Sequence, residues 1–419
     1  MTAATSPLKA FDVIILGAGA AGLMCALTAG QRGAKVLLLE HADRVGAKIL
    51  ISGGGRCNFT NLASAPDRFL SGNPHFCRSA LGRYTQADFI GLVERHRIPY
   101  HEKTLGQLFC DGSARAIVAM LLAECARGGV DVRLGHSITD VSRSDGFRVE
   151  TSHGGFTAPA LVLATGGLSI PKMGATGLSH AVARRFGLGL VEPLPALVPL
   201  RAGPEALGFA PVLAGVSLEA IVSCGAQSFR ESILFTHHGL SGPAILQISS
   251  YWRPGDTIRL DLLPDVAASQ NGFLIERKQA RPRAEAKTVL AELLPTRLAQ
   301  ALAEAGLPAG ALANIPDRAL ADFAARLKGW EVRPTGTEGW SKAEVTLGGI
   351  DTRQLSSKTM EASRIPGLYV IGEAVDVTGW LGGYNFQWAW SSGWCAGEAV
   401  SGRSVSSENV IVKQTGDDG

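Results

Sequence analysis

The chain has 419 residues, 46% of them hydrophobic, and a formal net charge of +3. This length allows two or three domains. The small charge does not by itself indicate a nucleic-acid partner, although a local basic patch remains possible. The seven cysteines are scattered without a CxxC pair, which argues against a disulfide framework or a metal site. No apolar run approaches the roughly 18 residues of a membrane span, and the first residues lack signal-peptide features, so we expect a cytoplasmic protein without stable membrane association.

A glycine-rich turn follows the first buried strand, which we expect at residues 11–16. The turn has the pattern GxGxxG and consists of Gly17, Ala18, Gly19, Ala20, Ala21 and Gly22. Gly17 permits the tight turn, Gly19 lets backbone approach a pyrophosphate, and Gly22 lets the following helix pack against the strand. Glu40 closes the next apolar run, where its carboxylate can accept hydrogen bonds from a ribose diol. The pattern predicts a dinucleotide cofactor, whereas a purely structural turn would not need the acidic partner.

The next 130 residues or so alternate between helical and strand patterns. A polar, glycine-rich loop is expected over residues 41–62, and amphipathic helices are expected around 86–96 and 113–127. The expected strands are 130–134, a strand beginning at 137–141, 147–151, and the buried run 160–163, which ends in Ala164, Thr165, Gly166 and Gly167.

The character of the sequence changes after Pro193. Short strands at 197–201, 216–222 and 257–262 lie between Gly and Pro breaks and predict a small antiparallel sheet or barrel. Residues 284–328 have helical spacing, and strands return at 342–347 and 367–371. The expected domains are a discontinuous nucleotide-binding domain (8–194 and 345–403), an inserted β domain (195–270 and 330–344), a helical insert (271–329) and a flexible tail (404–419).

Glycines end strands at three distant places, residues 16–22, 164–167 and 371–373. In an open α/β sheet, cofactors bind outside the carboxyl ends of the strands. The three ends therefore predict one Rossmann-like site built from distant segments. Because only one full GxGxxG is present, we expect a single tightly held cofactor, with NAD(P)H as a possible transient electron donor.

The C-terminal segment favours a flavin as that cofactor. Asp376 follows Gly372 and Glu373 at a distance suited to the ribityl chain or a phosphate. Gly382 and Gly383 precede a helix whose bare N–H groups would stabilise the negative charge of a reduced flavin ring, and Asn385 and Gln387 can add hydrogen bonds. A helix N-terminus with ordinary packing is the alternative.

Three further residues are candidates for chemistry, each with a structural alternative. Arg56 can bind a phosphate or a substrate anion, or form a surface ion pair. Cys57 can protonate a substrate carbon opposite hydride delivery, although a small packed thiol is the favoured interpretation. His237 or His238 can act as an acid, a base or a substrate ligand, or can belong to a turn before a helix that starts at Ser241 or Gly242 with Pro243 in its first turn.

Three motifs together resemble the HI0933-like flavoproteins, also described as YhiN-like or BaiN-like. The motifs are Ser52-Gly53-Gly54-Gly55-Arg56-Cys57-Asn58-Phe59-Thr60-Asn61, then residues 235–243, and then residues 372–377 with 382–387. The resemblance covers residues 11–400. It implies bound FAD, a Rossmann-like domain, and an inserted antiparallel β domain that carries a small helical subdomain.

The resemblance also implies which residues hold FAD. Glu40 would bind the adenosine ribose, the backbone of Ile138 would meet the adenine, and Lys48 would approach the flavin half. His41 occupies a position that is often basic in the family. The complete expected set is Gly17, Ala18, Gly19, Ala20, Ala21, Gly22, Glu40, His41, Lys48, Gly54, Gly55, Arg56, Cys57, Asn58, Ile138, Ala164, Thr165, Gly166, Gly372, Glu373, Asp376, Gly382, Gly383, Tyr384, Asn385 and Gln387.

The family's associated activities, which the resemblance implies, reduce a carbon–carbon double bond in a steroid-like acid or in a uracil of ribosomal RNA. We therefore expect an FAD-dependent oxidoreductase that acts on a small molecule or an RNA base by hydride transfer from flavin N5. A basic run, residues 277–287, could track RNA phosphates or simply be a solvated helix start. A flavin-binding sensor without turnover is the third hypothesis. The sequence leaves the oligomeric state open.

Overall fold

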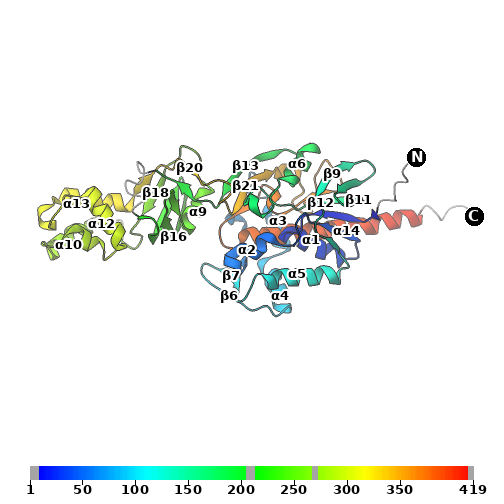
Figure 1. The fold of residues 1–419 in the computed structure, drawn as a ribbon, viewed down its shortest axis with the longest axis horizontal. Coiled ribbons are helices and arrows are strands. Elements are labelled where there is room, and N and C mark those ends of the chain that lie inside the picture. The colour runs from blue at the N-terminus through cyan, green and yellow to red at the C-terminus, as the bar shows by residue number, and fades with distance from the viewer. Residues whose placement is uncertain (1–8, 204–212, 267–271, 414–419) are drawn as a thin grey trace, which may run out of the picture. The chain divides into compact units, whose positions relative to one another are not determined.

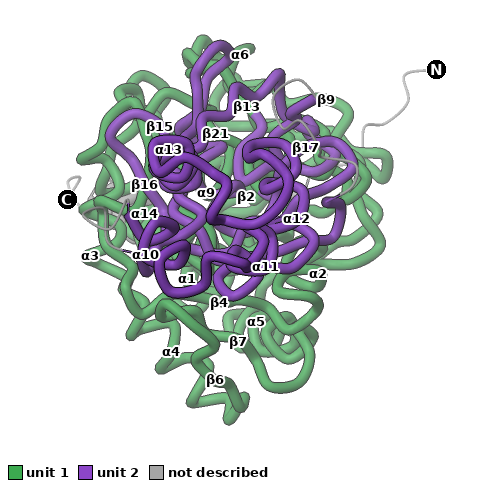
Figure 2. Tube along the Cα trace, turned by 90° about the vertical axis from the view of Figure 1, so that its left-hand side faces the viewer, with its two compact units in different colours: residues 1–194, 345–419 green, residues 195–344 purple. Residues whose placement is uncertain are grey.

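The structure is a computed structural model that describes residues 9–203, 213–266 and 272–413 (Figure 1). It divides into two compact units, which Figure 2 colours separately. Unit 1 contains residues 1–194 and 345–419, and unit 2 contains residues 195–344. The chain thus leaves unit 1 after Leu194 and returns to it at Val345.

A five-stranded parallel sheet forms the centre of unit 1. Its order is β22 (Leu368–Val370), β12 (Ala160–Leu163), β2 (Val13–Leu16), β3 (Val36–Leu39) and β8 (Asp131–Arg133). All residues of the first four of these strands are buried, as expected where both faces of a parallel sheet are covered. The chain runs outward from β2 through β3 and β8 and then returns to β12 on the other side of β2. This reversal between β2 and β12 is where α/β sheets bind their ligands.

Helices α1 (Ala20–Gly30) and α14 (Tyr384–Lys413) lie side by side in unit 1 (Figure 1). Glycines make this close packing possible. A Cβ at Gly393 would come within 2.5 Å of the carbonyl oxygen of Ala21, and one at Gly397 within 2.6 Å of the Cβ of Thr28. Helix α14 continues through Lys413, so the tail expected from residue 404 lies partly in this helix and, from residue 414, outside the described residues.

Smaller elements complete unit 1. Helix α4 (Gln86–Arg95) begins with a capping box between Thr85 and Asp88. A four-stranded sheet has the order β1 (Lys9–Ala10), β11 (Gly154–Ala158), β10 (Phe147–Thr151) and β9 (Ile138–Arg143), and a three-stranded sheet the order β4 (Asn58–Asn61), β7 (Gln107–Cys110) and β6 (Tyr100–Glu102). The other elements are α2 (Ala47–Gly55), β5 (Phe69–Leu70), α3 (Cys77–Arg83), α5 (Arg115–Arg127), α6 (Leu178–Arg185), β13 (Leu190–Ala196), β21 (Val345–Ile350) and β23 (Thr378–Gly379).

Unit 2 contains an antiparallel sheet and a group of helices. The seven-stranded sheet has the order β19 (Trp330–Val332), β18 (Ile258–Asp261), β15 (Ser217–Cys224), β16 (Gln227–Phe235), β17 (Gly239–Ser241), β14 (Leu200–Arg201) and β20 (Gly336–Thr337). The helices are α9 (Pro243–Ser249), α10 (Phe273–Ala280), α11 (Ala286–Leu290), α12 (Thr296–Gly306) and α13 (Asp317–Lys328). The helix expected at Gly242 is confirmed, because α9 has Gly242 as its N-cap and Pro243 at its first position.

The architecture confirms the expected fold class, a Rossmann-like α/β unit together with an antiparallel sheet. The expectation of a loop over residues 41–62 was wrong, because this segment contains helix α2 and strand β4. Helix α2 changes conformation at Ser52, where extended backbone is followed by left-handed glycines. Among the helices that the structure describes, none combines the length and the apolar character that crossing a membrane requires.

Candidate cofactor site

The turn between β2 and α1 depends on two glycines for its close contacts. Gly17 has a φ of 103°, and a Cβ there would lie 2.6 Å from the carbonyl oxygen of Ala164 at the end of β12. A Cβ at Gly22 would lie 1.9 Å from the carbonyl oxygen of Gly17, so only glycine lets α1 start this close to the turn. The two glycines thus hold the helix N-terminus against the carboxyl ends of two strands.

Gly19 differs from its two neighbours because it has open space in front of it. No atom lies within 4 Å of the Cβ position of Gly19, and this residue is the N-cap of α1, with no side chain capping the helix. The N–H groups of Ala20, Ala21 and Gly22 occupy the first turn, where an α-helix offers no internal acceptors. Unfilled space in front of uncapped helical N–H groups fits a diphosphate, as the sequence predicted.

Glu40 follows β3, and its side chain is 12% exposed. One carboxylate oxygen accepts the N–H of Ala18 at 2.8 Å, and the other accepts the N–H of Ala42 at 3.0 Å and lies 2.9 Å from Nδ1 of His41. Each carboxylate oxygen can accept two hydrogen bonds, so capacity remains for ribose hydroxyls. The carboxylate therefore fixes the glycine turn and still fits the ribose role expected of it.

The segment before β9 adjoins Glu40 on the side where the adenine is expected. The N–H of His136 donates to the carbonyl oxygen of Glu40 at 2.9 Å, and Ile138 begins β9 two residues later. Ile138 is half-buried. The structure thus places Ile138 near the expected ribose ligand.

The ends of β12 and β22 meet the start of α1. Thr165, which follows β12, is held by its side chain against Ser179 of α6 at 2.7 Å. Gly372, which follows β22, has its Cβ position 2.8 Å from the Cβ of Ala21. Gly166 has a φ of 75°, which favours glycine. The convergence of three distant strand ends that the sequence predicted is confirmed.

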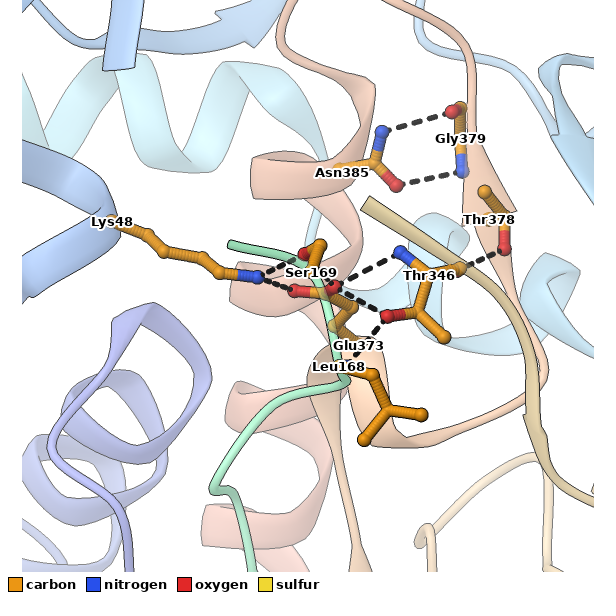
Figure 3. A network of polar contacts seen from close by, with 8 residues as sticks. All are labelled: Lys48, Leu168, Ser169, Thr346, Glu373, Thr378, Gly379 and Asn385. Atoms are coloured by element: carbon orange, nitrogen blue, oxygen red, sulfur yellow. Dashed lines mark hydrogen bonds and ion pairs between the residues drawn. The ribbon is translucent and has the colours of Figure 1, made fainter. Parts of the chain in front are cut away.

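Lys48 of α2 and Glu373 after β22 form a partly buried network beside these strand ends (Figure 3). Nζ of Lys48 donates to Oε2 of Glu373 at 2.6 Å and to the hydroxyl of Ser169 at 2.6 Å. Oε1 of Glu373 accepts hydrogen bonds from Ser169 at 2.7 Å and from both the N–H and the hydroxyl of Thr346 at 3.0 Å. The network joins four segments that are far apart in the sequence.

The environment of Glu373 sets the charge of this network. Burial alone raises the pKa of Glu373, but Lys48, Ser169 and Thr346 favour the carboxylate more strongly, so the net pKa lies below its usual value. Glu373 is therefore a carboxylate at neutral pH. Sequence reasoning missed Ser169 and Thr346, because isolated hydroxyl residues outside a motif carry no recognisable signal.

The last turn of α2 and the residue after it present backbone and one arginine to solvent. Gly53, Gly54 and Gly55 are left-handed, and no atom lies within 4 Å of the Cβ position of Gly54. Arg56 is exposed and forms no ion pair within the described part of the chain. The open space at Gly54 fits the flat ring expected there, and Arg56 is free to meet an anion.

Cys57 has a different environment from its neighbour Arg56. Its side chain is fully buried, and burial raises the pKa of its thiol. The thiol is thus protonated at neutral pH, and in the described structure it is shielded from solvent. This environment favours the packed-thiol interpretation over a catalytic one.

The glycines before α14 pack against the β4–β7 sheet. A Cβ at Gly383 would lie 2.4 Å from the carbonyl oxygen of Thr60, and one at Gly382 would lie 2.8 Å from the side chain of Gln107. Asn58 also contacts this point, since its Oδ1 lies 2.8 Å from the Cβ position of Gly383. Close packing thus explains why both positions require glycine. Tyr384 begins helix α14, as expected.

Two amides expected at the flavin ring are engaged by the chain itself. Asn385 donates to and accepts from the backbone of Gly379, at 2.8 Å in each case (Figure 3). Gln387 is fully buried, donates to the carbonyl oxygen of Tyr84 at 3.1 Å and accepts from the hydroxyl of Thr60 at 2.7 Å. These hydrogen bonds hold both side chains in place, and their contact with the flavin ring stays a prediction.

Asp376 likewise holds a neighbouring loop. It is buried, and its Oδ2 accepts the N–H of Gly72 at 2.8 Å. Burial raises its pKa, and the hydrogen bonds from Gly72 and Ser71 oppose this shift. Asp376 therefore holds loop 71–72 in place, and its contact with the cofactor stays a prediction.

The sequence-predicted residues of unit 2 lie at exposed positions. His237 and His238 form the exposed turn between β16 and β17, where the N–H of Thr236 donates to the carbonyl oxygen of Gly239 at 2.9 Å. Four of the five cations in the basic run 277–287 form ion pairs: Arg277 and Arg281 share Glu292, Lys278 pairs with Asp317, and Lys287 pairs with Glu285. This pairing weakens the expectation that the run follows RNA phosphates.

The arrangement as a whole fits a dinucleotide with a flavin end. Open space and uncapped N–H groups lie at Gly19, a carboxylate suited to a ribose lies at Glu40, and further open space lies at Gly54. Within the described ranges, no group of three or more His, Cys, Asp or Glu residues is arranged to hold a metal ion.

Comparison with known proteins agrees with this geometry. The family model described as the HI0933-like protein Rossmann domain matches residues 11–399. A ribosomal RNA dihydrouridine synthase of Escherichia coli K12 is 50% identical over 95% of this chain and 100% of its own length. A 3-dehydro-bile acid delta(4,6)-reductase of Clostridium scindens is 30% identical over 93% of this chain and 98% of its own length.

A solved structure supports the fold alone. The 3-ketosteroid-delta4-(5alpha)-dehydrogenase of Rhodococcus jostii RHA1 matches with a TM-score of 0.50 and 15% sequence identity. The match covers 96% of this chain and 98% of that protein. At this identity the likeness concerns the arrangement of elements and not the substrate.

Proposed function

Because the chain belongs to the family of HI0933-like proteins and is an FAD-dependent oxidoreductase, we propose that it reduces the C5=C6 bond of a uridine in ribosomal RNA to give dihydrouridine. The observation that carries this proposal is the 50% identity to the E. coli dihydrouridine synthase, which extends over the whole length of that relative. The bile acid reductase is similar over the same range but only 30% identical. Both relatives' names imply reduction of an activated carbon–carbon double bond.

The residues of unit 1 would divide the binding of FAD between its two halves. The N–H groups at the start of α1 would hold the diphosphate, and Glu40 would accept hydrogen bonds from the adenosine ribose. Lys48 and the backbone at Gly54 would lie along the flavin half. When bound and reduced, FAD supplies the hydride equivalent that a C=C reduction requires.

Uracil also needs a proton at C5 when C6 receives the hydride. The thiol of Cys57 is fully buried, so we expect Cys57→Ala to change the rate of dihydrouridine formation less than about 3-fold. Single-turnover rates of the prereduced enzyme measure this change. A large loss in Cys57→Ala would instead make this thiol the proton donor.

The electron donor is proposed to be NAD(P)H, bound transiently. The chain has one full GxGxxG, at Gly17 to Gly22, so NAD(P)H would have to bind without a second motif of this kind. Anaerobic mixing of the FAD-loaded enzyme with NADPH or NADH should bleach the flavin absorbance. Flavin that stays oxidised with both nucleotides would require another reductant.

Mapping of ribosomal RNA in a deletion strain tests the proposed function. We expect one uridine to replace a dihydrouridine in the deletion strain, and purified enzyme with reductant to restore dihydrouridine in that RNA. If the RNA of the deletion strain is unchanged and the purified enzyme reduces a Δ4,6 steroid acid, the chain would instead have the activity of the bile acid reductase relative. A flavin that reduces neither substrate class would contradict both.

A further inference from the structure

Exposed apolar side chains gather around the three-stranded sheet β4–β7–β6 of unit 1. Five large hydrophobic side chains are strongly exposed in the described part of the chain. Three of them, Ile51 at 45%, Leu62 at 47% and Leu105 at 60%, lie in α2, directly after β4 and between β6 and β7. Leu105, at the tip of the β6–β7 hairpin, is the most exposed of the five.

The backbone of Leu105 is held in a conformation that leucine rarely adopts. Its φ is 51°, in the left-handed region that favours glycine. The hairpin fixes this geometry: the N–H of Gly106 donates to Oε1 of Glu102 at 3.0 Å, and the N–H of Leu62 donates to the carbonyl oxygen of Gly106 at 2.8 Å. The exposed side chain of Leu105 adds little to the core, and backbone strain of this kind often occurs at functional positions.

One amide ties this tip to the candidate cofactor site. Nδ2 of Asn61 donates to the carbonyl oxygen of Leu105 at 3.1 Å and to that of Gly382 at 2.8 Å. The side chain of Gln107 also packs against Gly382. Leu105 therefore lies close to Gly382, in the segment before α14 where we expect the flavin half.

Charged groups of both signs lie near the tip. The carboxylate of Glu102 accepts the N–H of Gly106 at 3.0 Å, and Asp111 pairs with His101 at 2.6 Å. Lys103 is exposed and forms no ion pair within the described residues, and its Nζ lies 5.5 Å from the ring centre of Phe109. This cation can meet a phosphate beside the apolar side chain, and the choice of RNA as the partner comes from the proposed function.

We infer that Leu105 is a wedge that enters the RNA base stack at the place left by the target uridine. This inference rests on the proposed function. A base inside a folded RNA cannot reach a flavin unless it is extruded, and extrusion leaves a gap in the stack. Proteins that open such stacks insert apolar side chains, leucine among them, between the neighbouring bases. A rigid, exposed leucine beside the cofactor site provides that side chain.

The test compares Leu105→Gly with Leu105→Met in the FAD-loaded enzyme. Glycine accepts the left-handed backbone, so Leu105→Gly should keep its FAD content and thermal midpoint, while methionine keeps the apolar bulk. On folded ribosomal RNA from the deletion strain, we expect Leu105→Gly to lower kcat/KM about 30-fold, and Leu105→Met to stay within about 3-fold of the wild type. Leu293→Ala, at a similarly exposed leucine of unit 2, is the control.

A second substrate separates a wedge from other roles. A single-stranded ten-residue RNA that contains the mapped uridine needs no opening of a folded stack, so Leu105→Gly should reduce it at close to the wild-type rate. Equal losses of Leu105→Gly on both RNAs would show that Leu105 contacts the uracil itself. Full activity of Leu105→Gly on the folded RNA would show that Leu105 has no role. Either result overturns the wedge. Failure of the wild-type enzyme on both RNAs would instead overturn the proposed function.

Discussion

The Gly19→Val variant should fold like the wild type and yet lose FAD. Gly19 has ordinary backbone angles and no atom within 4 Å of its Cβ position, so the apoprotein can accept a larger side chain there. The same space is where we expect the diphosphate to meet the first turn of α1. A valine would keep the phosphates away from the helical N–H groups, and we expect FAD affinity to fall about 100-fold or more, about 2.7 kcal/mol.

The neighbouring glycine should respond in the opposite way. A Cβ at Gly22 would lie 1.9 Å from the carbonyl oxygen of Gly17, so Gly22→Ala must displace α1 from the strand ends. We expect this variant to lose about 2 kcal/mol of folding stability, because it overpacks a tight contact. Flavin absorbance per chain, FAD titration and urea unfolding separate the two effects, with Gly112→Val, at another glycine with open space, as the control. An intact FAD site in Gly19→Val would contradict the proposed diphosphate position.

The parts of the structure that were predictable from the sequence are those set by local pattern. A GxGxxG after a buried strand fixes where α1 starts, and parallel strands put their carboxyl ends at one edge. Residues 16–22, 164–167 and 371–373 therefore had to meet, and the contacts of Gly17 with Ala164 and of Gly372 with Ala21 confirm it. The start of α9 at Pro243 was equally readable, because proline at the first helical position after glycine is a local signal.

The parts that the sequence could not supply depend on partners far along the chain. Gln387 bonds to Tyr84 and Thr60, which lie 303 and 327 residues before it, and also to nearby Ser391. Arg281 is paired with Glu292, so the run 277–287 contains fewer unpaired cations than its composition suggests. Helix α2 was missed because its last residues are glycines, which in a sequence predict a loop. In each case the residue type was compatible with a ligand, and tertiary contacts gave it another partner.

The Lys48→Met variant should destabilise the protein and reverse the pH dependence that Glu373 contributes. Lys48 provides the counter-charge for a carboxylate whose side chain is 18% exposed. Removing one partner of an ion pair leaves the other charge without compensation. Because Lys48 is a third exposed, we expect the free energy of unfolding at pH 8 to fall by about 2 kcal/mol, which is less than for fully buried pairs. Without the lysine, burial dominates and the pKa of Glu373 should rise above its usual value.

The sign of the pH effect follows from these two pKa shifts. In the wild type the folded-state pKa of Glu373 is lowered, so its contribution to stability is present above the unfolded-state pKa and is lost as pH falls through the folded-state pKa. In Lys48→Met the folded-state pKa is raised, so stability should be highest at low pH and fall as pH rises through the interval between the unfolded and folded values. The wild-type slope lies below the ordinary glutamate pKa of about 4.3, and the slope of Lys48→Met lies above it, so urea unfolding from about pH 3 to about pH 8 at saturating FAD measures both.

The double variant Lys48→Met/Glu373→Gln decides whether Glu373 is the group responsible. A neutral amide at position 373 can still accept the hydrogen bonds of Ser169 and Thr346 through its oxygen, and it requires no counter-charge. We therefore expect the second substitution to recover most of the stability that the first removes at pH 8, and to abolish the altered slope. If the double variant is as unstable as Lys48→Met and keeps its slope, the lysine acts through another group and the network does not depend on a charged Glu373.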